Sequence, residues 1–418
     1  MATTYLTTSV VQSGIIWESD GSSEVFGLLP GVNGVNTSGI GVSVLHTNVS
    51  VNVLGYLGST GNNVIYVDAA ATNATIFVGS EGTLNTGTKS VGSGAVYSQA
   101  ENTVVVNDGT IFGGAGLYFE GLTSYTENRG VIQATPNIDD GALLESTGIK
   151  LGAASSGVAA DHTVVNYGVI SGSSYSIASL EDFYSFDNAT DLIYNHGTLQ
   201  GAVALGTLDD RLENSGQIEG EVSLGSGADT FVGRPGGTYS GTINGDDGID
   251  MLVGGDFDDI FNGGGDEDVL RGGAGNDLLL GDRQADLLRG GRDDDELRGG
   301  QGGDELHGNR GDDTLLGGSG QDILIGGRGD DTLTGGTNPD DFVFADRFGH
   351  DVITDFDATD NNEDIDLSGV TAITGYTDLQ NNHMTQQGSH VVIDAGDGNT
   401  ITIQNVDIAD LGAADFLF

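Results

Sequence analysis

Residues 245–343 read, in blocks of nine, GDDGIDMLV, GGDFDDIFN, GGGDEDVLR, GGAGNDLLL, GDRQADLLR, GGRDDDELR, GGQGGDELH, GNRGDDTLL, GGSGQDILI, GGRGDDTLT and GGTNPDDFV. The eleven blocks follow one another without an insertion, and the eighth place is always apolar. A flexible, acidic, glycine-rich linker is the alternative that composition allows, but nothing in a linker maintains such a register. The sixth place is always Asp: Asp250, Asp259, Asp268, Asp277, Asp286, Asp295, Asp304, Asp313, Asp322, Asp331 and Asp340.

Each block predicts one turn followed by one strand. Glycines at the first, second and fourth places let the backbone enter the φ > 0 region and direct carbonyls inward. Places seven to nine alternate polar, apolar and polar, which predicts a three-residue strand with one inward side chain. Two blocks then form one coil, so Asp residues eighteen apart, such as Asp277 and Asp295, are expected to face each other across neighbouring coils. Carboxylates and carbonyls are the oxygen ligands that Ca²⁺ prefers.

The charge of this stretch agrees with a cation requirement. Residues 245–343 hold 22 Asp, 3 Glu and 7 Arg, a net charge of −18. At an intermediate effective dielectric, each close carboxylate pair costs roughly a few kcal/mol. Eleven blocks give nine pairs of Asp eighteen apart, and we therefore expect several bound Ca²⁺ ions, up to about nine.

The phrase G-G-x-G-x-D-x-U-x, in which U is apolar, resembles the calcium-binding nonapeptide of RTX (repeats-in-toxin, hemolysin-type) proteins. The resemblance implies a parallel β-roll in which Ca²⁺ lies between turns, held by sixth-place carboxylates and by carbonyls of the glycine side. Phe257, Gln284 and Asn338 replace the fourth-place glycine and predict weaker sites in blocks two, five and eleven. The glycine ligands predicted in the best-matching blocks are Gly272, Gly273, Gly275, Gly299, Gly300, Gly302, Gly317, Gly318, Gly320, Gly326, Gly327 and Gly329.

The composition of the whole chain restricts its partners. The 418 residues carry 62 acidic and 13 basic side chains, a net charge of −49, so nucleic acid and anionic membrane surfaces are poor partners. No run of 18 apolar residues occurs, so no membrane span is expected. The N-terminal stretch has no basic n-region and does not read as a secretory signal peptide.

Residues 1–244 carry a looser repeat. Short alternating runs such as NTVVVNDGTIFGG predict strands, and the phrase N-x-G-x-(I/L/V)-x-(G/A) recurs. Asn and Gly tolerate a left-handed corner, after which the apolar residue begins an inward-facing strand. Coils of about 20 residues with loop insertions predict a parallel β-helix, and an antiparallel β-sandwich is the alternative. The repeated phrase begins at Asn107, Asn128, Asn166, Asn195 and Asn214.

The join between the two repeats suggests a continuous solenoid. Asp210, Asp229 and Asp250 each precede an apolar residue by two places, at spacings of 19 and 21. We therefore predict an all-β chain with three parts: a β-helix-like solenoid over 1–244, a calcium-binding parallel β-roll over 245–343, and a small β cap over 344–418. A rod without a linker between 225 and 250 is expected.

The C-terminal stretch 344–418 predicts a cap, because an open solenoid end exposes unpaired strand edges. The phrases FVF…G.D.I.DF, D.IDLSG and the terminal ADFLF resemble the C-terminal segment of RTX proteins exported by type I secretion. In that family the export signal is C-terminal and uncleaved. A cap without a targeting role is the alternative, and the two roles are compatible.

Motifs of several enzyme classes do not occur in the sequence. There is no H-E-x-x-H, no G-x-S-x-G and no Cys. A β-helix followed by RTX blocks also resembles alginate epimerases and polysaccharide lyases, which act on acidic sugars. Residues 1–244 hold 23 acidic and only five basic residues, which does not suit such substrates. Asp182, Tyr184 and Asp187 form the densest mixed cluster and are interpreted as a solvated loop, so no catalytic residue is assigned.

The sequence therefore predicts a secreted, calcium-binding protein that folds when Ca²⁺ binds outside the cell. Its expected role is structural or adhesive, in a matrix, a surface layer or a cell contact, and a polysaccharide-active epimerase or lyase is the alternative. The expected partners are calcium ions and the type I secretion machinery, with cell-surface glycans or further copies of the chain as candidates. The expected location is extracellular or at the cell surface.

Overall fold

The computed structural model describes residues 3–418 other than 9, 13–16, 20, 22, 37–39, 60–62, 87–93, 122, 135–136, 140–141, 145–146, 153–159, 180–188 and 360–361. The chain divides into two compact units. Unit 1 comprises residues 1–230 and 236–241, and unit 2 comprises residues 231–235 and 242–418. The predicted loop cluster of Asp182, Tyr184 and Asp187 lies outside the described residues.

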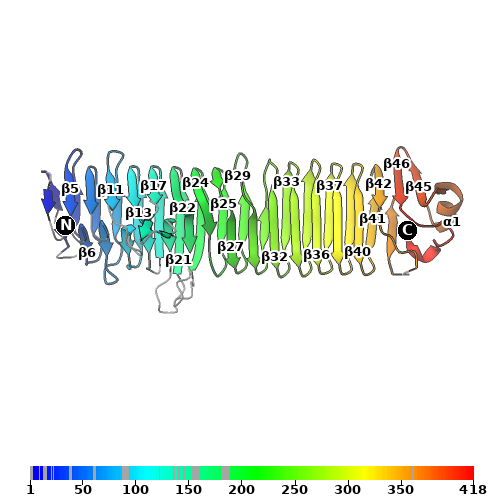
Figure 1. The fold of residues 1–418 in the computed structure, drawn as a ribbon, viewed down its shortest axis with the longest axis horizontal. Helices are drawn as coiled ribbons and strands as arrows, with labels where there is room; N and C mark the ends of the chain where they lie inside the picture. Colours follow the sequence, from blue (N-terminus) through cyan, green and yellow to red (C-terminus); the bar gives the residue numbers. More distant parts are fainter. Residues whose placement is uncertain are drawn as a thin grey trace. The chain divides into compact units, whose positions relative to one another are not determined.

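Strands of unit 1 follow one another from coil to coil (Figure 1), and their pairing defines three stacks. The first stack contains β1 (Thr3–Leu6), β4 (Val25–Leu28), β7 (Ser50–Val53), β10 (Thr75–Val78), β13 (Thr103–Asn107), β16 (Thr123–Asn128), β21 (Ala160–Asn166), β23 (Ala189–Asn195) and β25 (Arg211–Asn214). The second contains β2 (Val10–Gln12), β5 (Asn33–Asn36), β8 (Tyr56–Ser59), β11 (Thr83–Thr86), β14 (Thr110–Gly113), β17 (Val131–Ala134), β22 (Val169–Ser179), β24 (Thr198–Ala204), β26 (Gln217–Glu219) and β29 (Thr238–Tyr239). The third contains β3 (Trp17–Glu18), β6 (Val42–Val44), β9 (Ile65–Val67), β12 (Gly94–Ser98), β15 (Ala115–Phe119), β20 (Thr147–Leu151) and β27 (Val222–Ser226), and the later residues of β22 and β24 pair into it.

Strand pairing within the three stacks is parallel throughout. Successive strands of the first stack are offset by 21 residues between Thr103 and Ser124, by 38 between Thr123 and Asp161, and by 19 between Leu192 and Arg211. The longer offsets accommodate loops between coils. This arrangement confirms the predicted parallel solenoid and excludes the antiparallel sandwich, whose strands would pair in opposite directions.

The recurrent Asn of unit 1 has a different role from the predicted one. Each of the five ends a strand of the first stack, is fully buried, and is absent from the residues with positive φ. The Asn128 side-chain amide donates to Oδ1 of Asn166 at 2.8 Å, and Asn166 donates in turn to Asn195 at 2.8 Å. The expected left-handed corner at Asn is therefore wrong. A buried amide needs partners for both its donor and its acceptor, and the next coil supplies them.

Unit 2 contains two stacks of parallel strands offset by eighteen residues (Figure 1). One stack contains β31 (Met251–Val253), β33 (Val269–Ala274), β35 (Leu287–Arg292), β37 (Glu305–Arg310), β39 (Ile323–Arg328) and β41 (Asp341–Ala345). The other contains β30 (Ile243–Asp247), β32 (Ile260–Gly265), β34 (Leu278–Arg283), β36 (Glu296–Gln301), β38 (Thr314–Ser319) and β40 (Thr332–Thr337).

Most of these strands have six residues rather than the predicted three, because the first three places of the following block also pair across coils. The prediction of one inward apolar side chain per block is confirmed. The apolar residues at the eighth place are all fully buried and form the interior of the roll: Leu252, Phe261, Leu270, Leu279, Leu288, Leu297, Leu306, Leu315, Leu324, Leu333 and Phe342.

The C-terminal part of unit 2 continues both stacks. Strands β42 (His350–Ile353) and β43 (Asp364–Gly369) pair with β40 and β41, and β46 (Asn399–Ile403) and β47 (Phe416–Leu417) pair with β42 and β43. β44 (Met384–Gln387) and β45 (His390–Gly396) add antiparallel strands next to β46. A short helical segment, α1 (Tyr376–Asp378) followed by a π-helical turn over Leu379–His383, precedes β44.

Candidate metal centre

The eleven sixth-place Asp residues of unit 2 form two buried columns. Each directly precedes the seventh place, and none is more than 3% exposed. In nine of them the backbone N–H donates to Oδ1 of the Asp eighteen residues later, for example Asp277 to Asp295 at 2.9 Å and Asp304 to Asp322 at 2.8 Å. The predicted pairing across coils is thus present. A parallel stack with an eighteen-residue period brings identical places of alternate blocks into contact.

In eight of these Asp residues the second carboxylate oxygen is buried without a donor. Oδ1 is occupied by a backbone N–H, whereas Oδ2 has no hydrogen-bond partner among the described residues. An acceptor in this position loses its hydration and gains nothing from the protein, which is unfavourable unless a cation is bound. The residues with such an Oδ2 are Asp268, Asp277, Asp286, Asp295, Asp304, Asp313, Asp322 and Asp331.

Electrostatics in the columns favour a bound cation. The pKa of Asp295 is raised to about 8, mainly by burial and also by the carboxylates of Asp277 and Asp313 in the neighbouring coils, while the hydrogen bond from the Asp277 N–H lowers it. The same causes raise the pKa of Asp277 to about 7 and that of Asp304 to about 6. Without a cation, these groups are only partly ionised near neutral pH.

The first-place glycine is required for a steric reason that the sequence prediction missed. A Cβ on Gly317 would overlap Oδ2 of Asp322 and the carbonyl oxygen of Gly335. The first-place residues Gly272, Gly299, Gly317 and Gly326 are absent from the residues with positive φ. The expectation of φ > 0 at the first place is therefore wrong. Glycine is needed there because the carboxylate of its own block occupies the space of a side chain.

The second and fourth places do adopt the predicted left-handed backbone. Gly318 and Gly320 have φ of 115° and 139°. A Cβ on Gly318 would overlap the carbonyl oxygen of Gly300 in the preceding coil. The carbonyl oxygen of Gly300 thus points towards the glycine turn of the next coil. The other predicted glycines at these places also have positive φ: Gly273, Gly275, Gly300, Gly302, Gly327 and Gly329.

The blocks with a replaced fourth-place glycine differ in backbone. Gln284 and Asn338 keep the left-handed conformation, with φ of 63° and 83°, whereas Phe257 is not among the positive-φ residues and is half exposed. A bulky side chain disfavours the left-handed region, so block two forms a different turn. The lower affinity of these sites remains a prediction.

The donor set suits a hard cation. No group of three or more His, Asp or Glu side chains converges anywhere in the part of the chain that the structure describes. An ion between coils would therefore take its ligands from one or two carboxylates, from backbone carbonyls and from water. Such an all-oxygen set is typical of Ca²⁺, whereas Zn²⁺ prefers nitrogen and sulfur. The unsatisfied Oδ2 atoms and the carbonyls of the turns fit calcium, and the liganding role of each named residue remains a prediction.

A second column, at the fifth place of the even-numbered blocks, was missed from the sequence. The N–H of Asp312 donates to Oδ1 of Asp294 at 2.8 Å, and that of Asp330 donates to Asp312 at 2.8 Å. These carboxylates are exposed, unlike the sixth-place column. Asp294 and Asp312 border a groove of about 320 Å³ whose walls also include Asn276 and Glu296. The sequence pattern that could have predicted this column is Asp or Asn at the fifth place of every second block.

Unit 1 brings a Ser, a His and an Asp together in one row. These residue types also form nucleophilic catalytic sites, but here the row is buried. Ser124 pairs with His162, and His162 with Asp191, in the register of the first stack. Ser124 Oγ lies 2.8 Å from His162 Nδ1. All three residues are buried, and burial lowers the pKa of His162 to about 4. The row faces the interior of the solenoid, where a substrate has no access.

A row of neighbouring tyrosines lies on the third stack of unit 1, with Tyr66 and Tyr97 half-buried and Tyr118 buried. The ring centroids of Tyr66 and Tyr97 are 5.8 Å apart, and those of Tyr97 and Tyr118 are 5.1 Å apart. The Tyr97 hydroxyl donates to Glu120 at 2.5 Å, and Lys150 Nζ lies 4.5 Å from the ring of Tyr118. Burial and the Glu120 hydrogen bond raise the pKa of Tyr97. This row was also missed, because its members are 21 to 31 residues apart.

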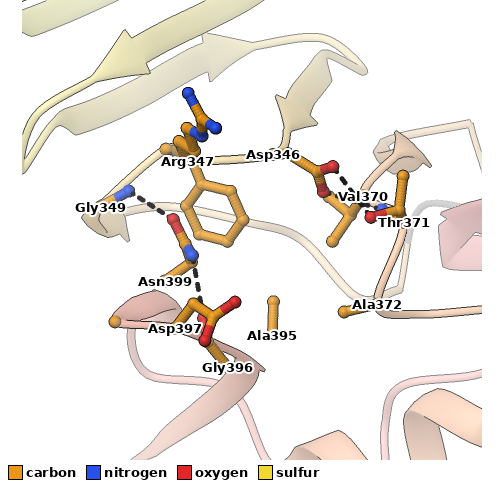
Figure 2. A pocket seen from close by; sticks show the side chains of 12 residues that line it. Asp346, Arg347, Gly349, Val370, Thr371, Ala372, Ala395, Gly396, Asp397 and Asn399 are labelled. Carbon is orange, nitrogen blue, oxygen red and sulfur yellow. Dashed lines mark hydrogen bonds between the residues drawn. The ribbon is translucent and has the colours of Figure 1, made fainter.

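A pocket of about 560 Å³ lies in the C-terminal part of unit 2 (Figure 2). The Asp346 carboxylate accepts hydrogen bonds from the N–H and hydroxyl of Thr371 at 2.9 and 2.8 Å. The Arg347 side chain points away from Asp397 and Asn399 (Figure 2). The Asp346 carboxylate is thus engaged by Thr371 and holds that loop in place.

Comparison with known proteins identifies the array. The family "RTX calcium-binding nonapeptide repeat" matches residues 244–279, 271–306, 280–315 and 307–342. Residues 244–342 thus form an array of RTX calcium-binding nonapeptide repeats, as the sequence predicted, and the ion bound by such repeats is Ca²⁺. A search of curated proteins finds no match. In the described residues, no helix is long and apolar enough to cross a membrane.

Two solved structures are similar to parts of the chain. The extracellular lipase LipA from Serratia marcescens aligns over 46% of this chain and 45% of the lipase, with 18% identity and a TM-score of 0.24. The AlgE6R3 subunit of the Azotobacter vinelandii mannuronan C5-epimerase aligns over 33% of this chain and 81% of that subunit, with 26% identity and a TM-score of 0.19. The chain spans less than half the length of the lipase.

Proposed function

We propose that this chain is a secreted protein whose nonapeptide array folds when Ca²⁺ fills it outside the cell. The buried Oδ2 atoms of the Asp columns carry the proposal, because they have no donor and stand close to further carboxylates. Where a metal site exists only in the folded state, the free energy of metal binding becomes free energy of folding. At low Ca²⁺ the repulsion and the glycine entropy favour an expanded array. At about millimolar Ca²⁺, as outside cells, the roll closes.

Export in the unfolded state fits this coupling. We propose that residues 344–418 both cap the array and present the signal for a type I secretion machinery. The support is the sequence resemblance of this segment, together with the β-strands that it adds to both stacks of the roll. Deleting residues 404–418 should abolish export from cells that carry such a machinery. Undiminished export of the truncated chain would contradict the signal.

The role of the folded protein is proposed to be structural or adhesive, in a matrix, a surface layer or a cell contact. The parallel stacks place equivalent residues of successive coils next to one another, and the buried Ser124–His162–Asp191 row offers no open site. Candidate partners are cell-surface glycans and further copies of the chain. Analytical ultracentrifugation and glycan-array binding in Ca²⁺ distinguish these two partners.

A polysaccharide-active enzyme is the second candidate, favoured by the row of Tyr66, Tyr97 and Tyr118 with Glu120 and Lys150. Hydroxyl, carboxylate and ammonium groups in one row could contact an acidic sugar. Incubation of the Ca²⁺-loaded chain with alginate, pectin and other glycans tests it. Depolymerisation or a changed uronate ratio would overturn the structural role.

The calcium-dependent folding has a direct test. Circular dichroism and hydrogen exchange of the full chain should show an array, residues 278–337, that is unprotected in EDTA at pH 8 and protected in Ca²⁺. Unit 1 serves as the internal reference, because its strands depend on apolar packing and the Asn column. An array that is equally protected in EDTA would overturn the proposal.

A further inference from the structure

Residues 346–354, DRFGHDVIT, form a degenerate twelfth block that follows the array after two extra residues. β42 pairs in parallel with β40, with Thr332 opposite Val352 and Leu333 opposite Ile353. The offset is therefore twenty residues instead of eighteen. The side chain at the eighth place, Ile353, is fully buried like its counterparts in the array.

The turn of this block has the same backbone as the turns of the array. Arg347 and Gly349, at the second and fourth places, have φ of 74° and 96°. The N–H of Gly329 donates to the carbonyl of Phe348 at 3.2 Å, as the N–H of Gly320 donates to that of Thr337 at 3.1 Å. The fifth-place column continues as well, because the N–H of His350 donates to Asp330 Oδ1 at 2.9 Å.

Asp351 occupies the sixth place of this block. It is 1% exposed, and its Oδ1 accepts the N–H of Asp331 at 3.0 Å. Its Oδ2 is buried and has no hydrogen-bond partner among the described residues, and the same is true of Oδ2 of Asp331. Asp351 therefore repeats the burial, the Oδ1 hydrogen bond and the unsatisfied Oδ2 of the sixth-place residues within the nonapeptide array.

We propose that Asp351 and Asp331 hold a further Ca²⁺ ion, at a site beyond the matched repeats 244–342. The inference rests on the proposed calcium binding of the array. Carbonyl oxygens of the flanking turns and water would complete the ligand set. Asp346 replaces the first-place glycine, and its carboxylate is held instead by Thr371. Because Asp346 and Arg347 stand where the repeat has glycine, the sequence pattern does not identify this block.

The proposed ion ties the C-terminal cap to the array. β42 lies between β40 and β46, and the N–H of Thr400 donates to Gly349 at 2.8 Å while that of Gln404 donates to Ile353 at 2.9 Å. The Asn399 side chain also accepts the N–H of Gly349 at 3.2 Å (Figure 2). Without the ion, the carboxylates of Asp331 and Asp351 are buried next to each other where the array meets the cap. Docking of β46 is therefore expected to depend on Ca²⁺.

Asp351→Asn in the full chain tests the site. The amide oxygen of Asn can still accept the N–H of Asp331, so the substitution removes the charge and retains the backbone contact. Native mass spectrometry in Ca²⁺ should count one ion fewer than in the wild type. The Ca²⁺ concentration that gives half-maximal hydrogen-exchange protection of residues 400–404 should rise about tenfold or more, as expected for the loss of one charged ligand. Asp410→Asn, an exposed carboxylate in the same cap, is the matched control and should match the wild type.

A wild-type ion count together with wild-type protection in Asp351→Asn would overturn the inference while leaving the array intact. A wild-type array, residues 278–337, that does not respond to Ca²⁺ would overturn the proposed function and this inference with it. Anomalous scattering from wild-type crystals grown in Tb³⁺ does not depend on the variant folding. A peak between Asp331 and Asp351 supports the site, and peaks confined to the eighteen-residue pairs refute it.

Discussion

The backbone N–H of Asp277 donates a 2.9 Å hydrogen bond to Oδ1 of Asp295, eighteen residues further along the chain, and Oδ2 of Asp295 remains buried without a donor. One carboxylate thus serves two purposes. Oδ1 fixes the register of neighbouring coils, and Oδ2 is available to a cation between them. This geometry recurs along both columns. The same carboxylates therefore fix the register of the roll and supply its buried negative charge.

Asp295→Asn should weaken calcium binding and relieve repulsion at the same time. The variant keeps an acceptor for Asp277 N–H but loses a charge flanked by Asp277 and Asp313. The Ca²⁺ concentration at half-folding should rise, whereas residual β structure in EDTA should increase. Calcium titration followed by circular dichroism measures both effects. Glu267→Gln, an exposed carboxylate on the same roll, is the control. A decrease of β structure in EDTA would contradict the repulsion argument.

Gly317→Ala should prevent the closure of one coil. Its Cβ would overlap Oδ2 of Asp322 and the Gly335 carbonyl, so we expect a loss of about 1–3 kcal/mol in the unfolding free energy of the Ca²⁺-loaded chain. Gly265→Ala is the matched control, because its Cβ would meet no atom closer than 3.5 Å and its φ is not positive. That change should stay within about 0.5 kcal/mol. Denaturant unfolding in Ca²⁺ provides the comparison, and equal effects of the two substitutions would refute the steric explanation.

Acid should partly replace calcium. The folded-state pKa values of the column carboxyls, such as about 6 for Asp313 and about 8 for Asp295, lie above the ordinary Asp value of about 4. Protons therefore bind the folded array more tightly than the unfolded one. The resulting stability is fully present below about pH 4 and is lost as the pH rises through about 6–8. Circular dichroism in EDTA should show more β structure at pH 5 than at pH 8.

In Ca²⁺ the dependence should reverse at the acid end, because protons compete with the ion for the same carboxylates. Calcium release on acidification, followed with a calcium electrode, measures this competition. An array in EDTA that gains structure as the pH rises would contradict the assigned direction of the pKa shifts.

Asn166→Ala should destabilise unit 1 without affecting calcium binding. The side chain of Asn166 accepts from Asn128 and donates to Asn195 at 2.8 Å, so its removal leaves two buried amides short of a partner. Each such loss costs roughly 1–3 kcal/mol. Gln200→Ala, an exposed residue of the next coil, should change stability by less than about 0.5 kcal/mol. Thermal unfolding of the two variants measures the difference. A shift in the calcium midpoint of Asn166→Ala would show that the two units are coupled.

The eighteen-residue period of the sequence was sufficient to predict the roll. Asp at the sixth place and an apolar residue at the eighth recur in every block, and they form the buried columns and the interior. The Asn phrase of unit 1 likewise marked its coils correctly, although the side chain of Asn166 stacks inside the solenoid instead of occupying a left-handed corner.

What the sequence determined by itself is the set of places that repeat, because neighbours in a stack are separated by a constant number of residues. Only the tertiary structure shows at which places of the repeat there is no space for a side chain. Gly317 is glycine for the space of the Asp322 carboxylate and not for its φ, and Asp351 joins the column although two extra residues interrupt the period. Both depend on contacts between coils, and parallel strand pairing enforces those contacts even where the residue types and the spacing change.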